Sequence, residues 1–142
     1  MNARETIHDY YDALRGGDPL GPFFADESPA EGDGADDDQY VKFGIGEQLV
    51  GSEAIRDGLG GQTATTADWT VESDALRVTE RACHAWFSDE VFMAWTDTER
   101  SIRFEFDTRW SGTLEARDED GRPDQDGEWR FVGMHVSTEA DT

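Results

Sequence analysis

The sequence predicts an α+β fold in which helical segments come first and an antiparallel sheet follows. Up to about residue 62, apolar residues recur mainly at helical spacing, whereas from Asp68 onward they alternate with polar residues at every second position. The long alternating segments are separated by turn-rich stretches, which is typical of sequential hairpins. Helices followed by such strands define the α+β class, and the length of 142 residues fits a single domain over residues 1–142.

Three helical elements are expected, over residues 3–15, 20–25 and 51–62. In the first, Ile7, Tyr10 and Leu14 lie on one face, and Gly16 begins the stretch that ends the helix. The third is opened by Gly51-Ser52-Glu53, which resembles a helix cap. The acidic stretch 26–39 has almost nothing to bury, and we interpret it as a mobile loop.

The expected strands cover residues 40–44, 68–80, 83–96, 101–116 and 128–137. The strand 101–116 has the clearest alternation. Its apolar members include Phe104, Phe106 and Trp110, and charged residues such as Asp107 and Arg109 stand between them. The sheet is therefore expected to have one aromatic face and one charged face at this strand.

The chain is strongly acidic, with 33 Asp and Glu against 12 Lys and Arg and a formal net charge of -21. A surface of this charge repels phosphate backbones and anionic lipids, so we expect neither a nucleic-acid partner nor attachment to a membrane. Lys42 is the only lysine, and the other basic residues are all arginine. This composition is similar to that of proteins from salt-in halophiles, and most of the acidic residues are interpreted as adaptation to salt.

Salt dependence of stability tests that interpretation. Molar salt shortens the Debye length to about 3 Å and screens the repulsion between surface carboxylates, whereas tens of millimolar salt leaves it largely unscreened. We expect the melting temperature to fall when the salt concentration is lowered over that range. A melting curve that does not change from low to molar salt would contradict the halophilic interpretation.

Several classes of site and location are disfavoured by the residues present. Cys83 is the only cysteine, so no intramolecular disulfide forms, and the absence of an apolar targeting core or membrane span points to the cytoplasm. The carboxylates of residues 118–128 lack the EF-hand order of ligands, and zinc-ligand spacing and a glycine-rich phosphate loop are missing. We therefore expect no metal and no cofactor.

Six segments, in this order, resemble the NTF2-like superfamily and its SnoaL-like branch. They are YYDALRGGD (10–18), FFADE (23–27), LVGSEAIRDGL (49–59), HAWFSDEV (84–91), FDTRWSG (106–112) and EWRFVGMHVS (128–137). The resemblance implies a cone in which a curved antiparallel sheet wraps N-terminal helices around a deep apolar pocket. It also implies a homodimer through the outer face of the sheet. With its acidic composition, the chain looks like a haloarchaeal SnoaL-like protein.

The resemblance to the ketosteroid isomerases within this superfamily covers only part of their site. Tyr10 matches their oxyanion-hole tyrosine, and Asp107 matches their protonated aspartic acid. The position of their catalytic base falls near Phe43, which cannot take a proton and is expected to line the pocket instead. Arg109 favours the ionised form of Asp107 and so opposes its role as a donor, which disfavours steroid isomerisation.

In the cone implied by the resemblance, Asp107 and Arg109 point inward. The aromatic residues Phe104, Phe106 and Trp110 lie on the outer face, against a partner subunit or covered by the rest of the sheet. His135 is placed on the same inward face, and because imidazole titrates near neutral pH it is the candidate acid or base of a SnoaL-like cyclase. The alternative is a structural histidine that bonds Asp107 or a backbone carbonyl.

The leading hypothesis is a homodimeric protein that binds a small hydrophobic molecule in the cone, and the sequence leaves open whether it also transfers a proton as an isomerase or cyclase does. A non-catalytic dimerisation or association module is the alternative, because the fold alone does not fix the function. The expected catalytic residues are His135, Asp107 and Tyr10, and the expected ligand contacts are Arg109, Trp86, Trp129 and Phe43.

Overall fold

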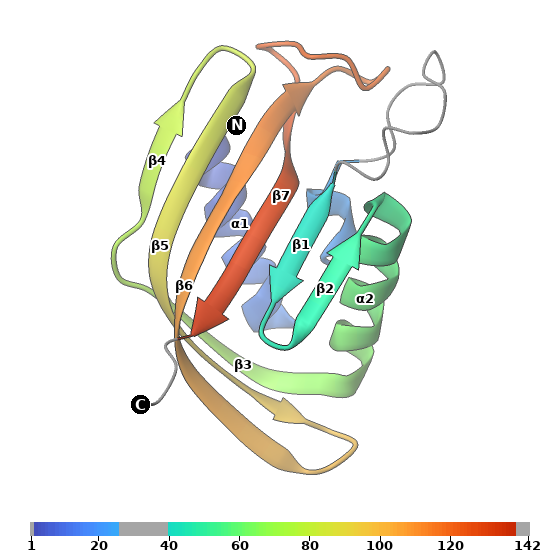
Figure 1. Ribbon diagram of the computed structural model, residues 1–142, viewed down its shortest axis with the longest axis vertical. Coiled ribbons are helices and arrows are strands. Elements are labelled where there is room, and N and C mark those ends of the chain that lie inside the picture. Colours follow the sequence, from blue (N-terminus) through green and yellow to red (C-terminus); the bar gives the residue numbers. More distant parts are fainter. Residues whose placement is uncertain (1, 26–39, 139–142) are drawn as a thin grey trace.

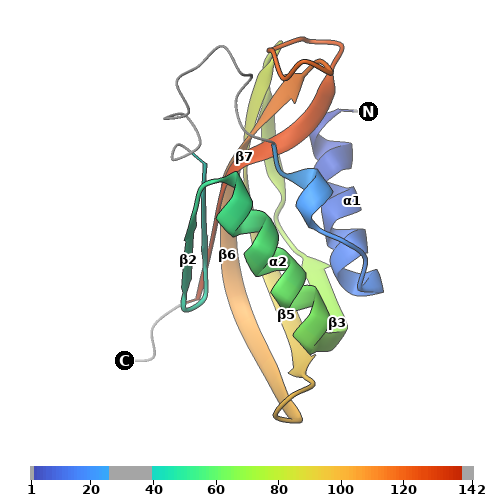
Figure 2. The same cartoon turned by 90° about the vertical axis from the view of Figure 1, so that its right-hand side faces the viewer.

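A curved seven-stranded sheet carries two helices and a 3-10 turn on its concave side in the computed structural model, which describes residues 2–25 and 40–138 (Figures 1 and 2). The elements are α1 (Ala3–Gly16), η1 (Gly21–Phe23), β1 (Val41–Gly44), β2 (Glu47–Val50), α2 (Ser52–Thr65), β3 (Thr66–Ser73), β4 (Arg77–Glu80), β5 (His84–Asp97), β6 (Ile102–Arg117) and β7 (Glu128–Thr138). The predicted α+β class is confirmed, whereas the predicted acidic loop 26–39 lies outside the described residues. In the described part of the chain, no helix is long and apolar enough to cross a membrane.

The strands follow the order β2-β1-β7-β6-β5-β3, and β4 also pairs with β5. All pairs are antiparallel except β1 with β7, which run parallel. The segment 68–80, predicted as one strand, is two strands separated by a short interruption, and the short strand β2 was not predicted. Together β1 and β2 form a hairpin at the edge of the sheet, next to α2.

Helix α1 follows directly from its sequence. Asn2 and Glu5 form a reciprocal capping box at its start, and Gly17 ends it in the left-handed conformation at φ 70°. The apolar face predicted for this helix is buried, including Tyr10 and Leu14. Helix α1 therefore lays one apolar side on the concave face of the sheet.

The two faces of β6 exist as predicted, but their expected orientation is wrong. Trp110 is buried, Phe104 and Phe106 are half-buried on the same concave side, and Asp107 and Arg109 are exposed on the convex side. Burying the aromatic set against the chain's own core removes apolar surface from water, whereas the charged set would have to be desolvated there. The chain's own core therefore takes the aromatic face that was expected to meet a partner.

Strand β7 also departs from strict alternation. The register between β6 and β7 shifts at Thr113, which leaves Val132 as an extra residue in β7. Because of this bulge, Phe131 and His135 lie on opposite faces of the sheet. Phe131 is buried in the core, and His135 is exposed on the convex side.

Asp89 is a buried carboxylate that joins α1 to the sheet. It is 3% exposed and accepts hydrogen bonds from the Tyr11 hydroxyl at 2.8 Å, the Ser73 hydroxyl at 2.6 Å and the backbone amide of Ala75 at 3.0 Å. Three donors offset much of the cost of burying the charge. We interpret Asp89 as a structural group.

Burial of two adjacent tyrosines predicts that stability falls in alkali. Burial, and then the charge of Glu47, raise the pKa of Tyr10 well above its ordinary value of 10.0, and burial with the bond to Asp89 raises the pKa of Tyr11 further. Above pH 10, these hydroxyls ionise in the unfolded chain but not in the folded one. The free energy of unfolding is therefore expected to fall by up to about 1.4 kcal/mol per pH unit for each tyrosine.

Urea denaturation between about pH 9 and pH 11 measures this slope. Tyr10→Phe is expected to make the fall with pH less steep, because one of the two linked ionisations is removed. The same slope in the wild type and in Tyr10→Phe would contradict the account.

Candidate functional site

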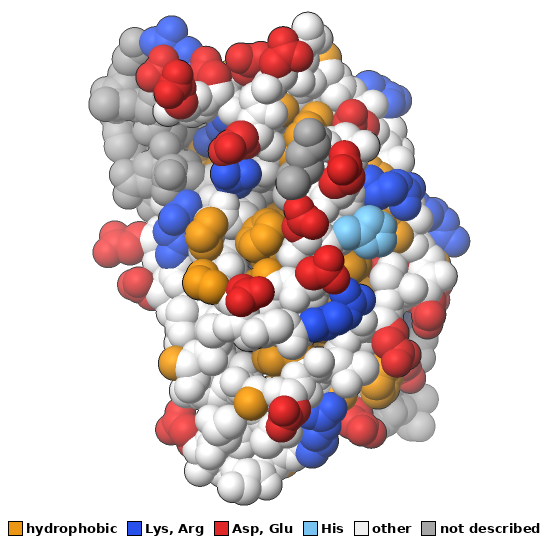
Figure 3. Space-filling view, turned by 180° about the vertical axis from the view of Figure 1, so that it is seen from behind, with side chains coloured by type: hydrophobic (Ala, Val, Ile, Leu, Met, Phe, Trp, Pro, Cys, Tyr) orange, Lys and Arg blue, Asp and Glu red, His pale blue; other side chains and the backbone are white. Residues whose placement is uncertain are grey.

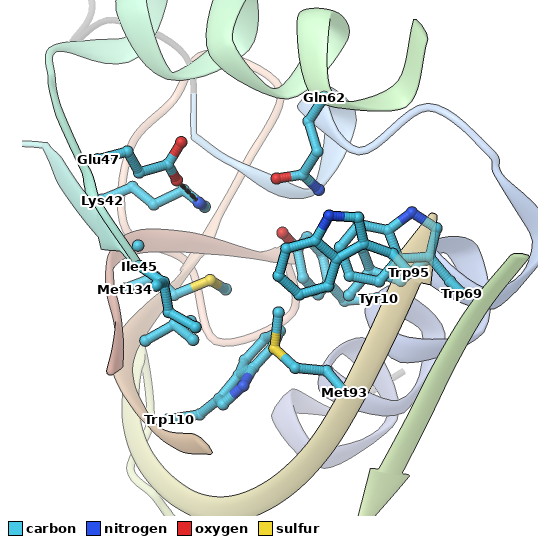
Figure 4. Close-up of a pocket in the computed structure, with 13 residues that line it drawn as sticks. Tyr10, Lys42, Ile45, Glu47, Gln62, Trp69, Met93, Trp95, Trp110 and Met134 are labelled. Carbon is cyan, nitrogen blue, oxygen red and sulfur yellow. Dashed lines mark hydrogen bonds and ion pairs between the residues drawn. The ribbon is translucent and has the colours of Figure 1, made fainter. Parts of the chain in front are cut away.

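A cavity of about 110 Å³ lies between α1, α2 and the concave face of the sheet, beside the β1–β2 hairpin. Most of its wall is aromatic or apolar, with Trp69, Trp95, Trp110, Met93 and Met134 among the lining residues (Figure 4). An engineered cavity of about 150 Å³ holds benzene in another protein. The space therefore fits a molecule, or part of a molecule, of a few heavy atoms.

Four polar side chains from three different parts of the fold meet in this cavity. Tyr10 comes from α1, Lys42 and Glu47 from the β1–β2 hairpin, and Gln62 from α2. Figure 4 shows Lys42 and Glu47 together on one side of the cavity and Gln62 above it. An apolar pocket with a few converging polar groups is the usual form of a small-molecule site.

Lys42, the only lysine of the chain, is 5% exposed and forms an ion pair with Glu47. Strand alternation turns Lys42 inward, while Phe43 turns outward. Gly44 faces Glu47 across the hairpin, and a Cβ added there would lie 2.7 Å from Cγ of Glu47. The glycine therefore leaves room for the Glu47 side chain to reach Lys42.

The Tyr10 ring is locked into the core, and its hydroxyl is turned toward the cavity (Figure 4). The ring makes edge contacts with Phe131 at 5.2 Å and Phe23 at 5.5 Å between centroids, and the residue is 1% exposed. Within the described residues, the hydroxyl has no hydrogen-bond partner. Because its pKa is raised by burial and then by Glu47, the hydroxyl stays protonated and is available as a donor.

Besides Tyr10, the cavity holds two polar groups that are available to a ligand, on Gln62 and Trp95. The other two indole N–H groups are already used, because those of Trp69 and Trp110 donate to the hydroxyls of Thr66 and Thr108, each at 2.9 Å. In contrast, the side-chain amide of Gln62 and the indole N–H of Trp95 make no hydrogen bond to the part of the chain that the structure describes. The cavity therefore has spare donor groups around an apolar space.

The residues predicted for catalysis do not come together. Tyr10 lines the cavity, whereas Asp107, His135 and the predicted ligand contact Arg109 lie on the convex face. The expectation that Asp107, Arg109 and His135 point into the cone is therefore corrected. The bulge in β7 and the burial of the aromatic face of β6 together explain this outcome.

The other predicted ligand contacts also lie away from the cavity. Trp86 is 46% exposed on the convex face, with the Arg81 guanidinium 5.2 Å from its ring centroid. Phe43 is 41% exposed and makes an edge contact with His135, and Trp129 is buried in the core but does not line the cavity. The tryptophans of the cavity are Trp69, Trp95 and Trp110.

Sequence reasoning missed the Lys42–Glu47 pair, although a signal for it was present. In a chain whose other basic residues are all arginine, one retained lysine on a predicted strand stands out. Across residues 2–25 and 40–138, no group of three or more His, Cys, Asp or Glu side chains is placed to hold a metal ion.

No protein-family model matches the sequence, and no curated protein matches it. Solved structures do match the fold. A candidate dehydratase of the NTF2-like family from Streptomyces avermitilis is 14% identical with a TM-score of 0.76, and the match covers 99% of this chain and 95% of the other. A ketosteroid isomerase-like protein from Erwinia carotovora atroseptica is 14% identical with a TM-score of 0.69, covering 97% and 94%.

A third match is a candidate calcium/calmodulin-dependent protein kinase type II association domain from Thiobacillus denitrificans. It is 15% identical with a TM-score of 0.63, and the match covers 98% of this chain and 96% of the other. The predicted NTF2-like cone fold is thus confirmed. The neighbours range from enzyme-like proteins to an association domain, so the function has to be argued from the cavity.

Proposed function

We propose that the cavity binds a small organic molecule through a carbonyl oxygen and moves a proton at the carbon beside it. The observation that carries this proposal is the hydroxyl of the buried residue Tyr10, which faces the cavity, is protonated and has no hydrogen-bond partner among the described residues. A preorganised donor of this kind stabilises the negative charge that develops on a carbonyl oxygen when the neighbouring carbon loses a proton. The dehydratase and isomerase-like fold neighbours support the same class of chemistry.

Each polar residue has a role in this reaction. The Glu47 carboxylate takes a proton from the carbon, the C–H electron pair moves into an enolate, and Tyr10 donates a hydrogen bond to the enolate oxygen. Protonation of the same or a conjugated carbon by Glu47 completes the transfer. Lys42 positions the Glu47 carboxylate at the cavity, and its ammonium charge favours the enolate.

We further propose that the chain is a SnoaL-like protein of haloarchaeal type.

Deuterium exchange into cyclopentanone tests the proposal without knowledge of the natural substrate. This small ketone has exchangeable protons beside its carbonyl, and it suits the size of the cavity. In D₂O with molar salt, we expect the protein to accelerate incorporation of deuterium at these carbons, with a rate that saturates as the ketone concentration rises. An exchange rate equal to that of buffer alone would overturn the proposed proton transfer.

The convex face supports a second proposal, that two copies of the chain associate through it. Neither helix covers this face (Figures 1 and 2), and it carries the exposed apolar side chains Phe43, Trp86 and Val50. Large apolar side chains left exposed on a face that no helix covers favour an interaction surface. Association and ligand binding use opposite faces of the sheet, so they are compatible.

Light scattering in molar salt measures the association. We expect the mass of a dimer for the wild type and of a monomer for Phe43→Glu, because the new charge would be buried in the interface. Ile102→Glu is the matched control, since Ile102 is 42% exposed but lies at the tip of the β5–β6 hairpin. A monomeric wild type would contradict this proposal.

A further inference from the structure

We infer that the molecule bound in the cavity is uncharged, and that the site rejects a carboxylate of the same shape. This inference rests on the proposed function and names the chemical class of its ligand. It follows from the balance of charge and of hydrogen-bonding groups among the residues that line the cavity.

The charges in the cavity are already balanced. Lys42 and Glu47 are the two ionised side chains among the lining residues that the structure describes, and they pair with each other. Tyr10 is neutral, since its pKa is raised. A carboxylate ligand would bring the buried site to a net negative charge, and a cationic ligand would bring it to a net positive charge. Either excess is costly in apolar surroundings, because a buried charge must be paired.

The hydrogen-bonding groups that remain suit a carbonyl oxygen. Spare donors are the Tyr10 hydroxyl, the Trp95 indole N–H and the amide of Gln62, and all three are neutral. Neutral donors bond a neutral acceptor without changing the charge of the site. They add no positive charge, so a bound carboxylate would leave the cavity with a net negative charge that only a further ammonium or guanidinium could balance.

The surroundings of the cavity act in the same direction. The Glu47 side chain lines the cavity and is 33% exposed, so its negative charge also acts on an anion in the surrounding solvent. Acidic side chains are also spread over the helix side of the molecule (Figure 3), and the chain carries a net charge of -21. An uncharged molecule meets neither barrier.

Two probe molecules of the same shape test the inference, 3-methylbutan-2-one and isobutyrate. The first is an uncharged methyl ketone, and the second carries a carboxylate in place of the acetyl group. The readout is the NMR shift of the Trp95 indole N–H in the wild-type protein at neutral pH and molar salt. We expect the ketone to bind at least about tenfold more tightly than isobutyrate. Isobutyrate binding as tightly as the ketone would overturn the inference and leave the proposed function standing.

If neither probe shifts the Trp95 signal, the cavity is no site for a small carbonyl compound. The proposed function then fails, and this inference fails with it. The two failures are distinguishable. If only the inference fails, isobutyrate binds as tightly as the ketone, whereas if the proposed function fails, neither probe binds. The wild-type comparison is decisive without any variant.

A charge variant gives a second, independent test. Glu47→Gln leaves the Lys42 ammonium without its counter-charge, so isobutyrate is expected to bind at least about tenfold more tightly than it does to the wild type. Glu115→Gln is the matched control, since Glu115 is 32% exposed and pairs with Arg117 at 2.7 Å, away from the cavity. Unchanged rejection of isobutyrate by Glu47→Gln would contradict the charge-balance argument.

Discussion

Tyr10→Phe is expected to slow deuterium exchange into cyclopentanone by about 100-fold to 1000-fold, the usual effect of removing one oxyanion donor. The folded protein loses no internal hydrogen bond, because the hydroxyl has no partner among the described residues. The ring stays packed among Phe23, Phe24 and Phe131. We therefore expect the free energy of unfolding at neutral pH to remain within about 1 kcal/mol of the wild-type value.

The neighbouring tyrosine is the control for this prediction. Tyr11 is also 1% exposed, but its hydroxyl donates to Asp89 and does not face the cavity. Tyr11→Phe leaves a buried carboxylate short of one donor, which is expected to cost about 1–3 kcal/mol of stability. The exchange rate per folded molecule should stay close to that of the wild type. An equal loss of exchange in both variants would contradict the role given to Tyr10.

Glu47→Gln is expected to lower the exchange rate by about 100-fold to 10,000-fold, because glutamine cannot take up the proton. The substitution keeps the size of the side chain, so the hairpin retains its shape. Rates are measured on cyclopentanone in molar salt beside Glu115→Gln, which removes an acidic partner of an ion pair elsewhere. A Glu47→Gln variant as fast as the control would show that Glu47 is not the base.

Gly44→Ala tests whether the exchange rate depends on the position of the Glu47 carboxylate as well as on its presence. The added methyl group would lie 2.7 Å from Cγ of Glu47 and push this side chain away from Lys42. The carboxylate remains, but its alignment with the cavity is lost. We expect an exchange rate between those of the wild type and Glu47→Gln.

Most of the fold could be predicted because its signals are local. The amphipathic pattern of helix α1 and the alternation along β5 and β6 were present in the residues. Strand β2 escaped prediction because it is only four residues long. The break between β3 and β4 depends on pairing with different parts of β5, which is a tertiary feature.

The site was harder to predict because alternation defines two faces without saying which is concave. Here the aromatic set of β6 belongs inside, as the hydrophobic effect favours, whereas the resemblance used in the sequence analysis placed it on the outer face. The face on which His135 lies depends on the bulge at Val132. This bulge is a property of the pairing between β6 and β7 and is not visible in the sequence of β7 alone. Lys42 was noticed only as a feature of composition, although it is adjacent to Phe43, where the resemblance to ketosteroid isomerases placed their catalytic base.

The central claim is that Tyr10 bonds a carbonyl oxygen inside the cavity. The most direct measurement is the carbon-13 NMR shift of carbonyl-labelled cyclopentanone bound to the protein, because a hydrogen bond to the oxygen polarises the carbonyl and moves its signal downfield. We predict a downfield shift with the wild type that disappears with Tyr10→Phe. The same shift with both proteins, or no bound signal with the wild type, would contradict the account.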